Sequence, residues 1–320
     1  KMVRYLFAYY IHGFNISSVY PLTGVVKITF NTPPDINIKH GNFDTPPLAL
    51  ADSGVLYCID NDSIYLKWES IGSFHIFRGQ EITVMPDPSV AIEIIQRFIK
   101  TAVLAVAMYQ RGLAVLHANA IVIDGKAIIL CGDSGCGKST LCAGLHSHGH
   151  HLLADDIVVC HQNGAGFQVY PGVQEFKLWP DSLVLLGVDH ENLPRVSTTM
   201  QKRVFTVEKG IYREPAVLSA IYILELGEED AVYPVAPLTA TMELIKNSYG
   251  IRLLQGLNAK EHFKRTMSIA QAIPLRKLKR KCELDNRTFS PGFVERRKHP
   301  RPVISTKNTH IYELIENDSV

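Results

Sequence analysis

The chain has 320 residues, of which 46% are apolar and 20% charged, and its net charge is +2. This composition is ordinary for a globular protein with a buried core, and the length predicts about two domains. The small net charge and the lack of any run of about 18 apolar residues argue against nucleic acid and membrane as partners.

Six cysteines are scattered along the chain without a C-x-x-C pair. The apolar stretch at 5–11 is interrupted by His12 and is followed by no small-residue cleavage site, so we expect no signal peptide. We therefore predict free thiols and a cytoplasmic location.

Residues 1–88 are predicted to form a β-rich module. They are rich in β-branched and aromatic residues, and turn residues separate short runs of that kind. The predicted strands are 24–32, 54–59, 63–68 and 73–77. After Pro86 and Pro88, apolar residues at helical spacing predict a helix over 90–109. We place the domain boundary at this helix, between 88 and 89.

A β-hairpin is predicted next, with strands at 118–123 and 126–131. Asp124 and Gly125 join them, and this pair favours a type I′ turn. The second strand runs into a glycine-rich segment at 132–139, and a helix follows over 140–148, ended by Gly149.

The glycine-rich segment matches the pattern G-x-x-x-x-G-K-[ST] in full. Its glycines let successive backbone N–H groups face phosphate oxygens, and the next helix adds its positive N-terminal end. Lys138 is expected to contact the β- and γ-phosphates of ATP, and the Ser139 hydroxyl to ligate Mg²⁺. The predicted ATP-binding residues are Gly132, Asp133, Ser134, Gly135, Cys136, Gly137, Lys138, Ser139 and Thr140.

Two adjacent aspartates, Asp155 and Asp156, interrupt an apolar run at 151–160, which we predict to be one strand. Neighbouring strand residues face opposite sides, so one carboxylate is expected to face the Mg²⁺–nucleotide and the other the acceptor hydroxyl or a buried partner. Buried carboxylates are costly unless they are paired or bound to metal. The alternative is a strand that ends early, with the aspartates in a turn.

Two further candidates for the site are His117 and Arg203. His117 lies at the entry to the hairpin, where it is expected to approach Asp155 and tune it, or else to be structural. The pair Lys202-Arg203 precedes a predicted strand at 204–207 and either supplies charge to the transferred phosphoryl group or is solvated.

The rest of the chain alternates predicted strands and helices. A strand is expected at 219–226, helices at 239–247 and 259–273, and a basic strand at 275–282. This completes a catalytic domain over 89–284, which leaves 285–320 as a polar, loose tail.

Four segments together resemble the HPr serine kinase family, whose catalytic domain is related to the PEP-carboxykinase-type P-loop fold. They lie at 111–120, 132–140, 149–156 and 177–180. The resemblance implies an α/β (α+β) P-loop kinase domain beside the smaller β-rich domain. It also implies that Asp155 is the base, supported by His117, and that Ser139 and Asp156 hold Mg²⁺. Beside the resemblance, we expect Lys138 and Arg203 to neutralise charge on the phosphates.

Departures from that family narrow the expected substrate. Thr140 stands where the bifunctional HPr kinase/phosphorylases usually carry Glu, and their second, glycine- and asparagine-rich signature is not found. The chain looks more similar to the shorter HPr-kinase-like proteins of lasso-peptide biosynthesis. This resemblance implies a cytoplasmic, ATP-dependent serine kinase that acts on the C-terminal serine of a precursor peptide.

Two other functions stay open. One is an HPr kinase or another small-molecule P-loop kinase, and the other is a nucleotide-binding regulatory module without turnover. The N-terminal module either recognises a leader peptide, shapes the acceptor groove or builds an interface, and a homo-oligomer is also open.

Overall fold

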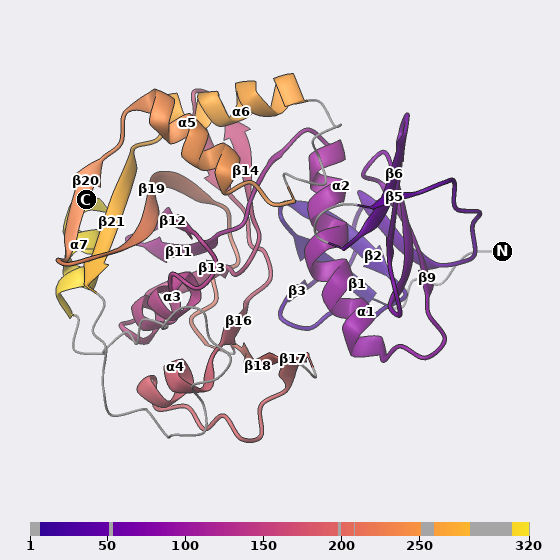
Figure 1. Ribbon diagram of the computed structural model, residues 1–320, viewed down its shortest axis with the longest axis horizontal. Coiled ribbons are helices and arrows are strands. Elements are labelled where there is room, and N and C mark those ends of the chain that lie inside the picture. Colours follow the sequence, from indigo (N-terminus) through magenta and orange to yellow (C-terminus); the bar gives the residue numbers. More distant parts are fainter. Residues whose placement is uncertain are drawn as a thin grey trace.

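The computed structural model describes residues 7–50, 54–197, 200–207, 209–250, 259–281 and 309–319. Within these ranges the chain forms two nine-stranded mixed sheets and one three-stranded sheet, together with helices (Figure 1). The α+β class predicted from the sequence is therefore confirmed.

The N-terminal sheet has the strand order β3-β1-β2-β4-β9-β8-β7-β6-β5. Its strands are β1 (Phe7–Ile11), β2 (Phe14–Ser18), β3 (Val26–Lys27), β4 (Ile36–His40), β5 (Ala49–Leu50), β6 (Leu56–Asp60), β7 (Ser63–Trp68), β8 (Gly72–Phe77) and β9 (Glu81–Pro86). The expected strands at 54–59, 63–68 and 73–77 are confirmed. The one at 24–32 is wrong for most of its length, because only Val26–Lys27 pair there.

The predicted helix after this module is confirmed as a continuous helical segment. It comprises α1 (Ile92–Phe98), the π-helical η1 (Ile99–Val103) and α2 (Leu104–Gln110). Its buried residues share one apolar core with the N-terminal strands, and Figure 1 shows it between that sheet and the rest of the molecule. In packing terms the helix therefore belongs with the N-terminal sheet, and the boundary at 88/89 stays a prediction.

The second sheet carries the chain into the glycine-rich loop. Its strands are β10 (Ala114–Leu116), β11 (Asn119–Ile123), β12 (Lys126–Gly132), β13 (His151–Ala154), β14 (Val158–Asn163), β15 (Gly166–Val169), β19 (Ala216–Gly227), β20 (Ala231–Pro234) and β21 (Leu275–Lys281). The hairpin of β11 and β12 is confirmed, and both turn residues have positive φ, 48° at Asp124 and 76° at Gly125, as a type I′ turn requires.

Helices cover both faces of this sheet, as Figure 1 shows, with α3 (Lys138–Ser147) on one side and α5 (Pro237–Lys246) and α6 (Ala259–Ala272) on the other. Successive residues of β12 alternate between the two apolar cores: Ile129 packs toward α5 and α6, and Ile128 and Leu130 pack toward α3. Burial on both faces explains why these strands read as continuous apolar runs.

The single strand expected at 151–160 is wrong. The chain forms β13 and β14, which pair with different neighbours, β11 and β10 respectively. The break falls at Asp155 and Asp156, where Asp156 has a φ of 70°. A left-handed residue cannot continue a strand, so the early-ending alternative describes the backbone correctly.

A small third sheet lies beside α4 in the lower part of Figure 1, with the order β16-β18-β17. It comprises β16 (Glu175–Leu178), β17 (Arg195–Ser197) and β18 (Met200–Thr206), and α4 (Pro180–Leu185) follows β16. The predicted strand at 204–207 is thus the end of a longer one, and Lys202 and Arg203 lie within it rather than before it.

The loose tail expected at 285–320 is wrong for its last part. Residues 309–319 form α7 (Thr309–Ser319), and Ile311, Tyr312 and Ile315 are buried in the core beside α3. Residues 285–308 and Val320 lie outside the described residues. Among the described helices, none has the length and apolar character needed to cross a membrane.

Candidate active site

The glycine-rich loop leaves β12 and enters α3 through a chain of left-handed glycines. The φ angles are 138° at Gly132, 89° at Gly135 and 91° at Gly137. At Gly132 a Cβ atom would also lie 2.7 Å from the carbonyl oxygen of Leu224. Only glycine suits such angles without strain, so the loop curls over the N-terminus of α3 as an anion site requires.

Lys138, the first residue of α3, turns back over the loop. Its Nζ donates to the carbonyl oxygens of Gly132 at 2.7 Å and of Asp133 at 3.2 Å. The exposed Asp133 carboxylate pairs with Lys246 at 3.0 Å. The ammonium group of Lys138 is thus held at the mouth of the loop by neutral carbonyls, which a phosphate would replace with a stronger, charge-assisted contact.

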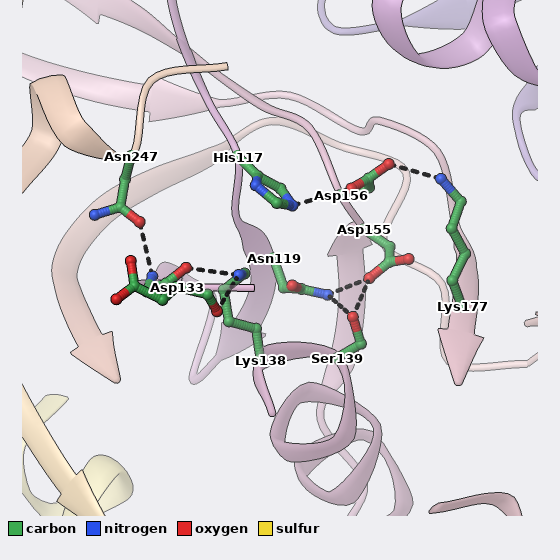
Figure 2. Close-up of polar contacts among 10 residues, drawn as sticks. His117, Asn119, Asp133, Lys138, Ser139, Asp155, Asp156, Lys177 and Asn247 are labelled. Atoms are coloured by element: carbon green, nitrogen blue, oxygen red, sulfur yellow. Dashed lines mark hydrogen bonds and ion pairs between the residues drawn. The ribbon is translucent and has the colours of Figure 1, made fainter. Parts of the chain in front are cut away.

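Asn247 holds the start of the loop in place from the opposite side. Its Oδ1 accepts the backbone N–H of Gly132 at 2.9 Å, and its backbone carbonyl accepts the N–H of His117 at 2.8 Å. Asn247 follows α5, so this helix ties the loop to the strand entry that carries His117 (Figure 2).

Asp155 lies directly beside the loop serine. Its Oδ1 accepts hydrogen bonds from Asn119 Nδ2 and, at 3.3 Å, from the Ser139 hydroxyl (Figure 2). Its Oδ2 is buried and has no hydrogen-bond partner among the described residues. One oxygen is therefore fixed by neutral donors, while the other remains available to a ligand.

The electrostatics of Asp155 favour proton uptake near neutral pH. Burial and the neighbouring charge of Asp156 raise the pKa of Asp155 to about 6, although Lys177, Ser139 and Lys202 act in the opposite direction. A base with a pKa near the working pH is well matched to general acid–base catalysis.

Asp156 has the opposite environment. Its Oδ1 lies 3.3 Å from His117 Nε2, and its Oδ2 lies 2.6 Å from Lys177 Nζ (Figure 2). Burial acts to raise the pKa of Asp156, but Lys177 and His117 outweigh it and hold the pKa well below its usual range. The Asp156 carboxylate is thus a firmly ionised partner of two basic groups.

One cavity, with a volume of about 110 Å³, brings most of the predicted residues together. Both aspartates line it, contrary to the expectation that they face opposite sides, because the break in the strand at Asp156 turns both inward. It is lined by His117, Ser134, Gly135, Gly137, Lys138, Ser139, Thr140, Asp155 and Asp156 among the expected residues. Cys136 instead packs its side chain in the core under the loop.

Arg203 is not part of this cavity, which corrects its expected position. Alternate residues of a strand face opposite sides, and here Lys202 faces the cavity. Arg203 donates from Nη1 to the carbonyl of Leu193 at 3.4 Å instead. Desolvation lowers the pKa of Lys202, while Asp155 and Asp156 act to raise it.

Sequence reasoning assigned no role to Asn119, Lys177 or Asn247, and it named Lys202 only as one member of the pair Lys202-Arg203. Asn119 and Lys177 lie inside the segments that carry the family resemblance, so those segments held a usable signal. The sequence held no such signal for Asn247, because this residue lies 115 residues from Gly132 in the chain. It reaches the loop only through the packing of α5.

The residues present fit ATP and a magnesium ion. The loop offers backbone N–H groups and an ammonium, and the Ser139 hydroxyl offers a hard oxygen donor for the ion. Mg²⁺ usually takes one or two protein oxygens together with phosphates and water, and the described residues contain no cluster of three or more metal-binding side chains. Asp156 fits the expected role of Mg²⁺ ligand poorly, because its two oxygens already contact His117 and Lys177.

Comparison with curated proteins finds short and medium-length matches to one kind of enzyme. A protein named HPr kinase/phosphorylase from Nitrosomonas europaea is 28% identical over 167 residues, which is 46% of this chain and 50% of that protein. Another of the same name from Malacoplasma penetrans is 47% identical over 45 residues, 14% and 15% of the two chains. These matches support an HPr kinase-like family for the chain.

The chain spans about half or less of the length of these curated relatives. No protein-family model matches it. A solved structure of the Hpr(Ser) kinase/phosphatase from Coxiella burnetii covers 53% of this chain and 86% of its own, with 15% identity and a TM-score of 0.31. The names of the curated relatives describe kinases.

Proposed function

We propose that this protein is an ATP-dependent phosphotransferase that moves the γ-phosphate of ATP to an acceptor hydroxyl. One observation carries the proposal: Asp155, with its raised pKa and its free Oδ2, lies in the same cavity as Lys138 and Ser139 of the phosphate loop. A structural loop would explain the glycines but not a half-satisfied carboxylate beside them.

In the proposed step, Asp155 Oδ2 accepts the proton of the acceptor hydroxyl. The hydroxyl oxygen forms a bond to the γ-phosphorus, the bond from that phosphorus to the β,γ-bridging oxygen breaks, and ADP leaves. Phosphoryl transfer depends mostly on positioning and charge neutralisation, and Lys138 and Lys202 supply positive charge within the cavity. Asn119 keeps the Asp155 carboxylate in position through its Oδ1.

Ser139 would hold Mg²⁺ together with the nucleotide phosphates, next to the Asp155 carboxylate. When bound, the ion would neutralise charge on the β- and γ-phosphates. Asp156 is assigned a different role, in which its charge holds Lys177 and His117 at the wall of the cavity. His117 then supports the site through Asp156 rather than by contact with Asp155.

The acceptor that we propose is a peptide serine, and more narrowly the C-terminal serine of a lasso-peptide precursor. Support for a kinase comes from the names of the curated relatives, and support for the serine and for the precursor comes from the family resemblance of the sequence motifs. A cytoplasmic location is part of the same proposal and rests on the cysteine pattern.

Labelled ATP separates the candidate acceptors. The protein is incubated with γ-labelled ATP, Mg²⁺ and either HPr, a lasso precursor peptide or free serine. We expect label on the precursor peptide, and none with a Lys138→Ala variant. Label on HPr alone or on free serine alone would show that this molecule, and not the precursor peptide, is the acceptor. No label with any acceptor would indicate a nucleotide-binding module without turnover.

A further inference from the structure

A second cavity, of about 660 Å³, adjoins the phosphate cavity. It lies between the helical segment α1–η1 and the small sheet of β16 and β18, where the N-terminal module meets the rest of the chain. Lys177 lines both cavities, so its side chain is a shared wall. A volume of this size is typical of ligand pockets and exceeds what one phosphate needs.

One face of the small sheet runs from the first cavity into the second. Lys177 pairs with Val204, and Glu175 pairs with Thr206, so these four residues share a face. Lys202, two residues before Val204 on the same face, lines the phosphate cavity. An extended chain bound along this face would therefore reach both cavities, since two strand residues span about 7 Å.

The second cavity is lined by apolar residues and by charged ones, which are Glu93, Arg97, Lys100, Lys177 and Lys209 besides Glu175. Its apolar lining residues are Val173, Leu193, Pro194, Val204, Phe205 and Val207. Glu175 also lines it and is 4% exposed, and its Oε1 has no hydrogen-bond partner among the described residues. Since buried polar atoms are nearly always satisfied, this oxygen points to a donor group on a ligand.

The walls of this cavity are held firmly. Lys100 of η1 donates to Glu175 Oε2 at 2.7 Å and to the carbonyl of Thr23 at 2.9 Å. The chain approaches so closely at Gly24 that a Cβ atom there would lie 2.2 Å from Glu175 Cγ. The N-terminal module and η1 thus together fix the side of the cavity that faces the sheet, as a preformed binding site requires.

We propose that this second cavity binds the acceptor peptide and determines its specificity. An extended segment lies along the face of β16 and β18, with its hydroxyl at Asp155 and an apolar side chain two residues away in the cavity. A backbone N–H of the peptide donates to Glu175 Oε1. This inference rests on the proposed phosphotransferase function and assigns the N-terminal module the role of shaping the acceptor groove.

The test compares two variants of the full chain on serine peptides. Each peptide carries one serine and, two residues before or after it, Leu, Phe, Gly, Lys or Asp. Thr206→Trp is expected to fill the second cavity from an exposed position opposite Glu175. The control, Gln201→Trp, places the same bulk on the same strand at an exposed residue that lines neither cavity. Thermal unfolding checks that both variants fold.

With the wild type we expect kcat/KM to be about tenfold higher for Leu or Phe than for Asp at one of the two positions. Thr206→Trp should abolish this preference by raising the KM for peptide, while the KM for ATP stays the same and Gln201→Trp behaves as wild type. A Thr206→Trp variant that matches Gln201→Trp overturns the acceptor site alone. A wild type that phosphorylates no serine peptide overturns the proposed function and this inference together.

Discussion

Asp155 and Asp156 are adjacent in the chain but have opposite electrostatic environments. Asp155 is held by the neutral donors Asn119 and Ser139, and its pKa is raised to about 6, whereas His117 and Lys177 keep Asp156 ionised. This division of roles follows from the backbone, because the positive φ of Asp156 brings both side chains to one cavity.

The raised pKa of Asp155 predicts a stability gain on removal of its charge. The carboxyl has a pKa of 3.8 in the unfolded chain and about 6 when folded, so its ionisation opposes folding above pH 6 and has no effect below about pH 3.8. Asp155→Asn should stabilise the fold by about 1–3 kcal/mol at pH 8 and leave stability unchanged near pH 3.5, as measured by urea unfolding. An equal effect at both pH values would contradict the electrostatic origin.

The titration of Asp155 also predicts how the rate of phosphoryl transfer falls as the pH is lowered. A base must be unprotonated, so kcat/KM for phosphoryl transfer should fall about tenfold per pH unit below pH 6. Initial rates between pH 4.5 and 8 at saturating Mg²⁺ measure this limb. A profile that stays flat down to pH 5 would show that Asp155 does not act as the base in the free enzyme.

At the residue level, the local sequence pattern predicted the phosphate loop well. It predicted poorly which side chains surround the loop. The spacing of Gly132, Gly137, Lys138 and Ser139 is a local signal that needs no knowledge of the fold. Whether Lys202 or Arg203 faces the cavity depends on the register of β18, and the sequence placed the start of that strand too late.

At the level of single elements, α7 is the least expected feature. It packs Tyr312 against Gly144 of α3 so closely that a Cβ atom at Gly144 would lie 2.1 Å from the Tyr312 hydroxyl. His150 of the following turn also pairs with Glu316 at 2.7 Å. The C-terminal helix therefore braces the helix that carries the phosphate loop.

This contact can be tested with a double-mutant cycle. Alanine normally stabilises a helix by about 1 kcal/mol over glycine, but Gly144→Ala should lower the melting temperature because it collides with Tyr312. In a Tyr312→Ala background the same change should become stabilising. Gly166→Ala, where the nearest atom would be 3.9 Å away, is the control. Additive effects of the two substitutions would show that α7 does not pack as described.

Elements with a strong local signal were predicted correctly, and those set by tertiary contacts were not. The hairpin around Asp124 and Gly125 and the helices α5 and α6 follow from turn chemistry and apolar spacing. The break at Asp156 and the helix α7 do not, because the run 151–160 is apolar beyond the aspartates and the segment 309–319 follows a polar, proline-containing stretch. Only the packing of the folded chain reveals the break at Asp156 and the helix α7.

At the scale of the whole molecule, a buried ion pair joins η1, in the helix that packs on the N-terminal sheet, to β16 of the small third sheet. Lys100 and Glu175 lie 2.7 Å apart with side chains only 7% and 5% exposed. Burial acts to lower the pKa of Lys100, whereas Glu175 acts to raise it. Removal of one partner from such a pair leaves an uncompensated buried charge.

Lys100→Met should therefore destabilise the protein by about 3–5 kcal/mol. The matched control is Lys39→Met, since Lys39 and Glu81 form an ion pair of the same length, 2.7 Å, with side chains 45% and 51% exposed. That change should cost less than about 1 kcal/mol. Denaturant unfolding measures both, and equal losses would indicate that the module is not held by the buried pair.

The central claim is that the phosphate loop and Asp155 form one phosphoryl-transfer site. Its most direct test is single-turnover transfer from labelled ATP, measured beside ATP affinity, for the wild type, Asp155→Asn and Lys138→Ala. We expect Asp155→Asn to bind ATP within about threefold of wild type while transfer falls by about 10³-fold, and Lys138→Ala to lose ATP binding. Near-normal transfer by Asp155→Asn would contradict the claim.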